Sequence, residues 1–292
     1  MHFMRQKRTA ETAARLKSRG ILEYTLNKTK KEHSMKKIWI TSLAKDERKI
    51  QQLMTTLKSY SMPLDGHFWV DDLKKMAWSN VIEPIMQKEV ALWVILADKA
   101  SLEVATIRKG LSLLAMVVQH GKGVRFPVLI LSLEGDLTSD KLPVLLKGAD
   151  ILPLSTPTLG AKVVALANVP VQKIDAGYRI TLHPLGGIGL WFEVGPSGDI
   201  DWPGALFAVN GAEIDFHGIG PADGIPERST LEYPVKGLKI NYSGEEYTGW
   251  GVQNTLKKDA SYYVRIQGVP DKILFGHFPT SDDAEMYAIA LC

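Results

Sequence analysis

HFWVDDLKKMAWSNVIEPIMQKEVALWVILADKASLEVATIRKGL, residues 67–111, contains the clearest signals of the fold class. It starts with a short apolar run, His67–Val70, followed by an acidic loop and a segment of helical character near Trp78. The run VALWVILAD, residues 90–98, is apolar at almost every position, as is typical of a central strand in a parallel sheet. A second helical segment begins near Ser101. The order strand, helix, strand, helix predicts an α/β sheet.

The same alternation continues on both sides of this stretch. KKIWITSL, residues 36–43, is a first strand, and Asp46 is placed to cap a helix over residues 46–60. Downstream, we expect strands at residues 125–133 and 149–154, and helices at residues 102–121, 138–147 and 158–168. Five strands alternating with helices predict a flavodoxin-like, five-stranded parallel sheet over residues 36–170.

The sequence changes character after Pro170. Helical periodicity gives way to glycines, aromatic residues and alternating runs, and Asn210-Gly211 between two such runs is a hairpin signal. TSDDAEMYAIAL, residues 280–291, is expected to form a terminal helix capped by Ser281. We therefore predict a smaller, antiparallel β-rich (α+β) domain over residues 171–292, either a sandwich or a barrel. No family is apparent in it.

Charge is unevenly distributed along the chain. Residues 1–37 hold 11 Lys/Arg and 3 Glu, a net charge of +8, whereas residues 171–292 hold 9 basic and 16 acidic residues, a net charge of −7. Residues 1–35 are expected to be a basic arm, partly helical or disordered, with a helix at Thr9–Ser18. Because the arm has no interleaved aromatic residues and no groove-reading motif, we do not expect nucleic-acid binding.

Two further features limit the class of protein. The single cysteine, Cys292, excludes an intrachain disulfide framework and a cysteine zinc cluster, and it favours a cytoplasmic location. No apolar run reaches the roughly 18–20 residues needed to cross a bilayer, so we expect no membrane span.

Several motifs follow one another in a recognisable order within residues 37–170. They are Ser42 with Lys45-Asp46, Trp69 with Asp71-Asp72, Trp78 near a helix start, and Trp93–Ala97 followed by Ser101. In this order and spacing the segment resembles Toll/interleukin-1 receptor (TIR) and TIR-like domains. The resemblance implies one of two roles: NAD consumption, or signalling and assembly by self-association or with another TIR-like protein. A receiver domain has the same strand order but needs a paired-acid site after the first strand, and here that strand ends in Thr-Ser-Leu.

The resemblance also implies where a site would lie. In the enzymatic branch of the family, a glutamate about six residues after the serine that starts the helix engages the nicotinamide ribose. Counting from Ser101 reaches Ile107. Glu103, one helical turn earlier and about 40° around the helix, is therefore the candidate catalytic residue, with a plain surface position as the alternative.

The candidate nucleotide-binding residues lie near the carboxyl ends of the strands, where ligands of such sheets bind. They are Ser42, Lys45, Asp71, Trp78 and Ser101. No cofactor and no metal is required, and NAD is the nucleotide that would serve as substrate or ligand. For Ser42, Lys45 and Asp71 the alternative is an ordinary solvated turn or loop.

Three functions follow from these residues. The first is a TIR-like signalling and assembly protein that could bind a nucleotide of the NAD type, with the C-terminal domain as sensor or partner-docking module. The second is an NAD-cleaving glycohydrolase, an NAD nucleosidase that would use Glu103. The third is a nucleotide-binding protein related to nucleoside deoxyribosyltransferases, which share the fold and also need a glutamate in the cleft.

The C-terminal half offers weaker candidates. His183, His217 and His277 are scattered, but Asp215 and His217 would share one face of a strand, where a metal or acid–base site is conceivable. Ordinary polar strand residues are the alternative. Three tryptophans are expected to be exposed and suited to a partner or ligand: Trp191, Trp202 and Trp250.

Overall fold

The computed structural model describes residues 35–172, 174–279 and 285–292. Within it, Lys37–Cys292 forms one compact unit. The basic arm predicted over residues 1–35 lies outside the described residues except for Met35.

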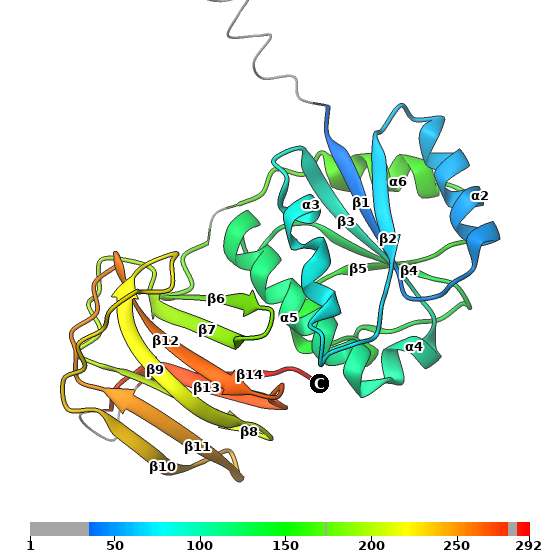
Figure 1. The fold of residues 1–292 in the computed structure, drawn as a ribbon. Helices are drawn as coiled ribbons and strands as arrows, with labels where there is room; N and C mark the ends of the chain where they lie inside the picture. Colours follow the sequence, from blue (N-terminus) through cyan, green and yellow to red (C-terminus); the bar gives the residue numbers. More distant parts are fainter. Residues whose placement is uncertain (1–34, 173, 280–284) are drawn as a thin grey trace, which may run out of the picture. The chain divides into compact units, whose positions relative to one another are not determined.

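A parallel sheet forms the first half of this unit. It consists of β1 (Lys37–Ser42), β2 (Leu64–Phe68), β3 (Val90–Ala97), β4 (Val128–Ser132) and β5 (Asp150–Pro153) (Figure 1). All pairings are parallel, in the order β2-β1-β3-β4-β5. This is the flavodoxin-like order, so the predicted fold class is confirmed. The central strand β3 is buried along most of its length, which explains its lack of polar residues.

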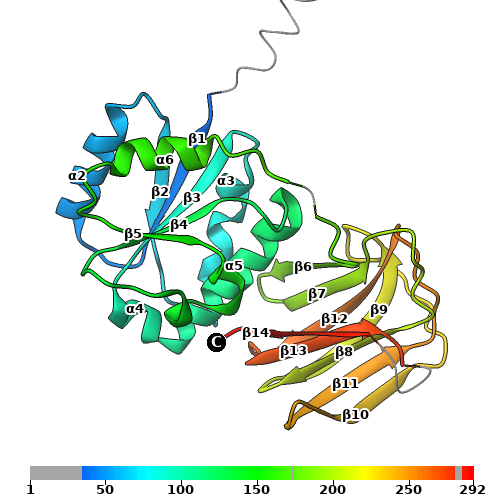
Figure 2. The ribbon, with the colours of Figure 1, turned by 180° about the vertical axis from the view of Figure 1, so that it is seen from behind.

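Helices cover both faces of this sheet (Figures 1 and 2). α2 (Glu47–Lys58) and α6 (Leu159–Ala167) pack on one face, where Ile38, Leu57 and Val163 share an apolar core. α3 (Ile82–Met86) and α5 (Ala105–Lys122) cover the other face. As predicted, the Asp46 side chain caps α2 by accepting a hydrogen bond from the Lys49 N–H at 3.1 Å.

Two predicted helices are interrupted. The helix expected over residues 102–121 breaks at Val104, which has extended backbone angles, into α4 (Lys99–Glu103) and α5. Asp98, and not Ser101, caps α4, because the Asp98 carboxylate accepts a hydrogen bond from the Ser101 N–H at 2.7 Å. The helix expected over residues 138–147 is two 3₁₀ turns, η2 (Ser139–Lys141) and η3 (Val144–Leu146), because Pro143 lacks the N–H that a continuous helix requires.

The helix expected near Trp78 also differs in detail. It starts as the 3₁₀ helix η1 (Ala77–Val81) and continues as α3. Pro84 is the third residue of α3 and lies in its first turn. An N–H at this position would have no acceptor within α3, so proline is tolerated there.

The second half is an antiparallel β-sandwich. Its strands are β6 (Tyr178–Leu185), β7 (Gly189–Pro196), β8 (Ala205–Asn210), β9 (Glu213–Pro221), β10 (Val235–Tyr242), β11 (Glu245–Val252), β12 (Ala260–Gln267), β13 (Lys272–His277) and β14 (Met286–Ala290). One sheet has the order β6-β7-β12-β9 and the other β10-β11-β8-β13-β14. The rings of Phe192 and Phe207, one from each sheet, lie 5.1 Å apart in the core between them.

Two sequence predictions in this half are wrong. From Met286 onwards the chain forms β14, which pairs with β13, in place of the predicted terminal helix. A short apolar run such as MYAIA is compatible with a helix or a strand, and the pairing with β13 makes it a strand. Residues 280–284, including the predicted Ser281 cap, lie outside the described residues. Asn210-Gly211 does form a turn, with Gly211 at φ +78°, but it joins β8 and β9 of different sheets and not the strands of one hairpin.

Helix α5 belongs to the cores of both halves. Its residues 110–118 are buried without interruption, a pattern expected only for a helix covered on all sides. One side packs on the parallel sheet and another on β6, so that Trp93, Leu114 and Phe192 belong to one continuous apolar core. Among the described residues, no helix combines the length and hydropathy that crossing a membrane would require.

Candidate functional site

The residues after β1 do not present a free hydroxyl to a ligand. Ser42 is 2% exposed, and its hydroxyl donates a hydrogen bond to the carbonyl oxygen of Ala44 at 2.6 Å. Lys45 is exposed. Ser42 therefore closes the turn that leads into α2, and only Lys45 remains open to a ligand at this point of the sheet edge.

The acidic loop after β2 is tied to α5. Asp71 is exposed, and its carboxylate accepts a hydrogen bond from the Thr106 hydroxyl at 2.7 Å. Asp72 instead accepts from the Lys75 N–H within its own turn, at 3.0 Å. The two neighbouring acids thus have different hydrogen-bond partners.

Trp78 is a core residue. It is 2% exposed and packs in the apolar layer formed with α3 and α5, so its ring is not available to stack on a base. Its indole N–H has no hydrogen-bond partner among the described residues. Trp78, predicted as a nucleotide-binding residue, is therefore enclosed in the core.

The two positions considered for a catalytic glutamate lie on different helices. Glu103 is the last residue of α4 and is exposed, whereas Ile107 belongs to α5 and is 8% exposed in the core. Because the chain is extended at Val104 between them, the helical-turn relation predicted for residues 103 and 107 does not hold. Glu103 therefore faces solvent.

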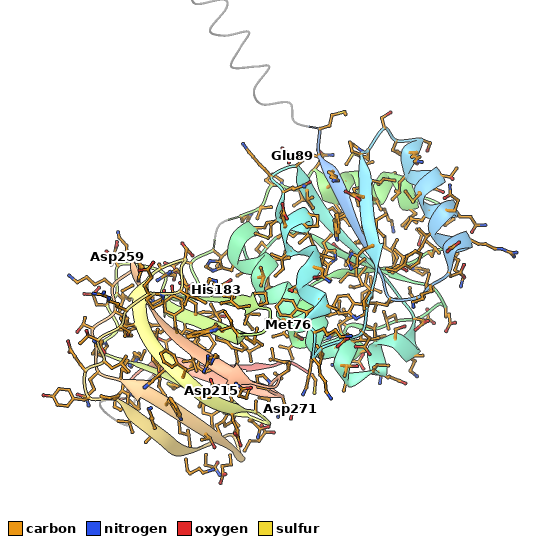
Figure 3. All side chains as sticks on the ribbon, in the orientation of Figure 1. Met76, Glu89, His183, Asp215, Asp259 and Asp271 are labelled. Atoms are coloured by element: carbon orange, nitrogen blue, oxygen red, sulfur yellow. The ribbon has the colours of Figure 1, made fainter. Side chains whose placement is uncertain are left out.

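Asp215 and His217 do not form a pair. A β-bulge where β9 pairs with Arg265 and Ile266 of β12 moves Asp215 out of register, so the two side chains do not share a face. Asp215 pairs with Arg265 at 2.8 Å, whereas His217 is 4% exposed and its Nδ1 lies 2.7 Å from the Tyr262 hydroxyl. Figure 3 shows Asp215 on β9 and His183 on β6, strands at opposite edges of one sheet.

The other candidates in this half also change. Trp191 and Trp202 are 7% and 4% exposed, so the expectation that they are exposed is wrong. Trp250 is partly buried, with the ammonium of Lys236 4.5 Å from its ring centroid. Within the described ranges, no group of three or more His, Cys, Asp or Glu side chains is arranged to hold a metal ion.

Strand β7 carries a buried carboxylate that the sequence analysis did not predict. Glu193 is 2% exposed, and His183 Nε2 lies 2.6 Å from its Oε2. Its Oε1 accepts hydrogen bonds from the Ser261 hydroxyl at 2.7 Å and from the Asp223 N–H at 2.8 Å. Arg179 Nη1 lies 3.9 Å away. We call these five residues, Arg179, His183, Glu193, Asp223 and Ser261, the Glu193 cluster.

The cluster fixes the charge of its central residue. Burial by itself raises the pKa of Glu193, but the hydrogen bonds from His183, the Asp223 N–H and Ser261 outweigh it and lower the pKa to about 2. Glu193 is therefore a carboxylate at neutral pH and can only accept hydrogen bonds, so Nε2 of His183 carries the hydrogen. The other ring nitrogen of this half-buried side chain, Nδ1, does not contact Glu193.

The cluster reaches α5 through Asp223. This residue adopts φ +64°, a left-handed conformation in which its N–H donates to Glu193, while its carboxylate lies 3.2 Å from His120 Nε2 on α5. The next N–H, that of Gly224, donates to the Tyr263 hydroxyl at 3.1 Å. Polar contacts thus run from α5 into the buried polar face of the sandwich.

The members of the cluster could not be grouped from the sequence, because they are up to 82 residues apart. The available signal was polar residues at alternate positions of three strands, as in Thr181 and His183, Glu193, and Ser261 and Tyr263. Alternation shows that such residues share one face of a strand, but only the register between strands brings them together.

By its fold the chain is a flavodoxin-like α/β module joined to an antiparallel β-sandwich. No family model and no curated protein matches it. Among solved structures, a putative pilus assembly-related protein from Burkholderia pseudomallei K96243 is similar at 14% identity, over 48% of this chain and 95% of that chain, with a TM-score of 0.32. A likeness of this size says nothing about what this chain binds or does.

Proposed function

We propose that the protein is a TIR-like signalling and assembly protein in which the β-sandwich is the sensor or docking half and the α/β half is the part that self-associates. The observation that carries the proposal is the burial of α5 in a core shared by both halves. A change of packing in the sandwich reaches α5 directly, since packed cores respond as coupled units.

The same geometry favours assembly over NAD cleavage. The residue in the position expected for the glutamate, Ile107, is buried, Glu103 ends a separate short helix in solvent, and Trp78 is enclosed in the core. An N-glycosidic bond held at the sheet edge would therefore lack the carboxylate that the enzymatic branch of the family uses.

Exposed apolar side chains supply a surface for self-association. Val70 is 61% exposed and Val104 is 41% exposed. The hydrogen bond between Asp71 and Thr106 joins the loop that carries Val70 to the first turn of α5, next to Val104, so both valines lie at one edge of the α/β half. We infer that a second copy of this chain covers them.

Light scattering across a concentration series tests this proposal. We expect the wild-type protein to form concentration-dependent oligomers, and Val70→Glu to weaken them by about tenfold, which corresponds to about 1.4 kcal/mol. Val169→Glu is the matched control, because Val169 is 49% exposed and lies after α6. A strict monomer at all concentrations would sink the proposal.

An NAD turnover assay separates the two roles. Under assembled conditions we expect no release of nicotinamide from the wild-type protein. Release that disappears in the Glu103→Ala variant would instead assign the chain to the NAD nucleosidases.

A further inference from the structure

A cavity of about 470 Å³ lies beside α5, where the sandwich begins. Its apolar wall includes Met116 of α5, Val124 just after it, Ile180 of β6 and Ile289 of β14. Small-molecule sites in proteins typically have volumes of about 300–1,000 Å³ and mostly apolar walls, with a few polar groups that fix orientation. The size and the wall therefore suit a small organic molecule.

Most polar groups on the wall already have partners. The Gln119 amide donates to the Leu145 carbonyl oxygen at 2.8 Å, and His120 contacts Asp223 at 3.2 Å. The Arg179 guanidinium donates to the carbonyl oxygens of Pro196 at 2.8 Å and Ala260 at 2.9 Å, and its charge is balanced by Glu193. An anionic ligand would therefore compete with a buried carboxylate for Arg179.

Asp175 is different. It is exposed, and its Oδ1 accepts hydrogen bonds from the Gly177 N–H at 2.9 Å and from the Ser197 hydroxyl. These bonds, that of Ser197 first, lower the pKa of Asp175, so the side chain is charged at neutral pH. Asp175 lines the cavity, and within the described residues its carboxylate forms no ion pair.

We propose that this cavity binds a small organic amine, with its ammonium group on Asp175 and its apolar body against Met116, Val124 and Ile289. The ring of Tyr178 also lines the cavity. The net charge of −7 over residues 171–292 favours the approach of a cation to this half.

The amine would contact both α5 and the segment that enters β6. Its binding would therefore act on the helix that the two halves share. This inference rests on the proposed function for its role as the sensor's ligand site, but amine binding is measured separately from assembly. If the amine binds without any effect on assembly, the sensor role is wrong but the amine site stands. If the protein assembles but does not bind the amine, only the amine site is wrong.

Calorimetric titration with three matched probes tests the site. 2-Phenylethylamine carries the ammonium group, 2-phenylethanol has the same body without charge, and phenylacetate has the opposite charge. We expect the amine to bind, and the alcohol and the acid to bind at least about tenfold more weakly. No binding of the amine at about 10 mM, or equal binding of the acid, overturns the proposal.

Two variants locate the binding. Asp175→Asn keeps the size of the side chain and removes its charge, and should weaken amine binding by about tenfold or more. Asp201→Asn removes the same charge at an exposed position of the same half that does not line the cavity, and should leave the affinity unchanged. Circular dichroism confirms that both variants are folded. An equal loss in both, or a loss in neither, contradicts a site at Asp175.

Discussion

Ser112 of α5 donates its hydroxyl hydrogen to the carbonyl oxygen of Leu291, at 2.8 Å and out of contact with solvent. The two residues are 179 positions apart, so this bond joins the centre of the α/β half to the end of the chain. Nearby, Lys109 pairs with Asp271 at 2.8 Å (Figure 3). These contacts accompany the apolar core that both halves share through α5.

Ser112→Ala removes the donor and leaves a buried carbonyl oxygen without its partner. We expect the free energy of unfolding to fall by about 1–3 kcal/mol. Urea denaturation measures the change. Ser59→Ala, which removes an exposed hydrogen bond to Thr56 at the end of α2, is the control and should cost less than about 0.5 kcal/mol. Equal effects of the two substitutions would show that the bond to Leu291 contributes nothing.

Glu193→Gln keeps the shape of the central side chain of the Glu193 cluster and removes its charge. Arg179 then loses the carboxylate that balances its charge, and His183 loses its hydrogen-bond acceptor; breaking such a buried pair costs about 3–5 kcal/mol. Denaturation at pH 7 measures this loss. Exposed Glu246→Gln, which also removes the partner of a cation, Lys239, is the control and should cost less than about 1 kcal/mol.

The same carboxylate makes stability depend on acid. Its folded pKa of about 2 lies below the ordinary value of 4.5, so its contribution is complete above about pH 4.5 and disappears as the pH falls towards 2. The shift corresponds to about 3 kcal/mol. In the wild-type protein, the free energy of unfolding should fall by about this amount between pH 5 and pH 2. In the Glu193→Gln variant, this part of the decrease should be absent. An unchanged slope would refute the assignment.

Two histidines, half-buried His67 and buried His217, act in a higher pH window. Burial lowers the pKa of His67 to about 4, and burial together with Lys236 lowers that of His217 to about 4. The unfolded chain takes up these protons near pH 6.5, so stability should fall as the pH drops from 6.5 to 4 and stay level above 6.5. Replacing both histidines by glutamine should flatten this part of the curve. A curve that keeps its slope would mean that the histidines are not the cause.

Replacing Trp78 tests whether this residue belongs to the core or to a ligand-binding surface. As a residue that is 2% exposed, it should cost about 3–5 kcal/mol when replaced by alanine. Tyr233→Ala, at a residue that is 76% exposed, is the control and should cost less than about 0.5 kcal/mol. Thermal unfolding of the two variants provides the comparison. A Trp78→Ala protein as stable as the wild type would contradict the burial of Trp78 in the core.

The order of strands and helices in the α/β half could be predicted because each element carries its own signal. The apolar run of β3 and the cap at Asp46 are local features, and both were confirmed. The extended residue at Val104 carried no such signal, because valine is accepted in helices and strands alike. Likewise, Met286–Ala290 became a strand only because β13 lies beside it.

The candidate sites were harder to predict, because they depend on register. Trp78 was predicted from the resemblance to TIR domains and Asp215 from its spacing to His217, but their positions are set by packing and by a bulge. Glu193 and its partners come from separate strands and a turn, and their contacts span 10 to 82 residues of sequence. No pattern within one segment contains that information.

Native-state hydrogen exchange in increasing urea tests the coupling through α5 most directly, because it follows both halves at once. We expect the most protected amides of α5, β3 and β7 to exchange with the same free energy of opening, since they belong to one core. A sandwich that opens at low urea while α5 and β3 stay protected would contradict the claim that the two halves form one cooperative unit.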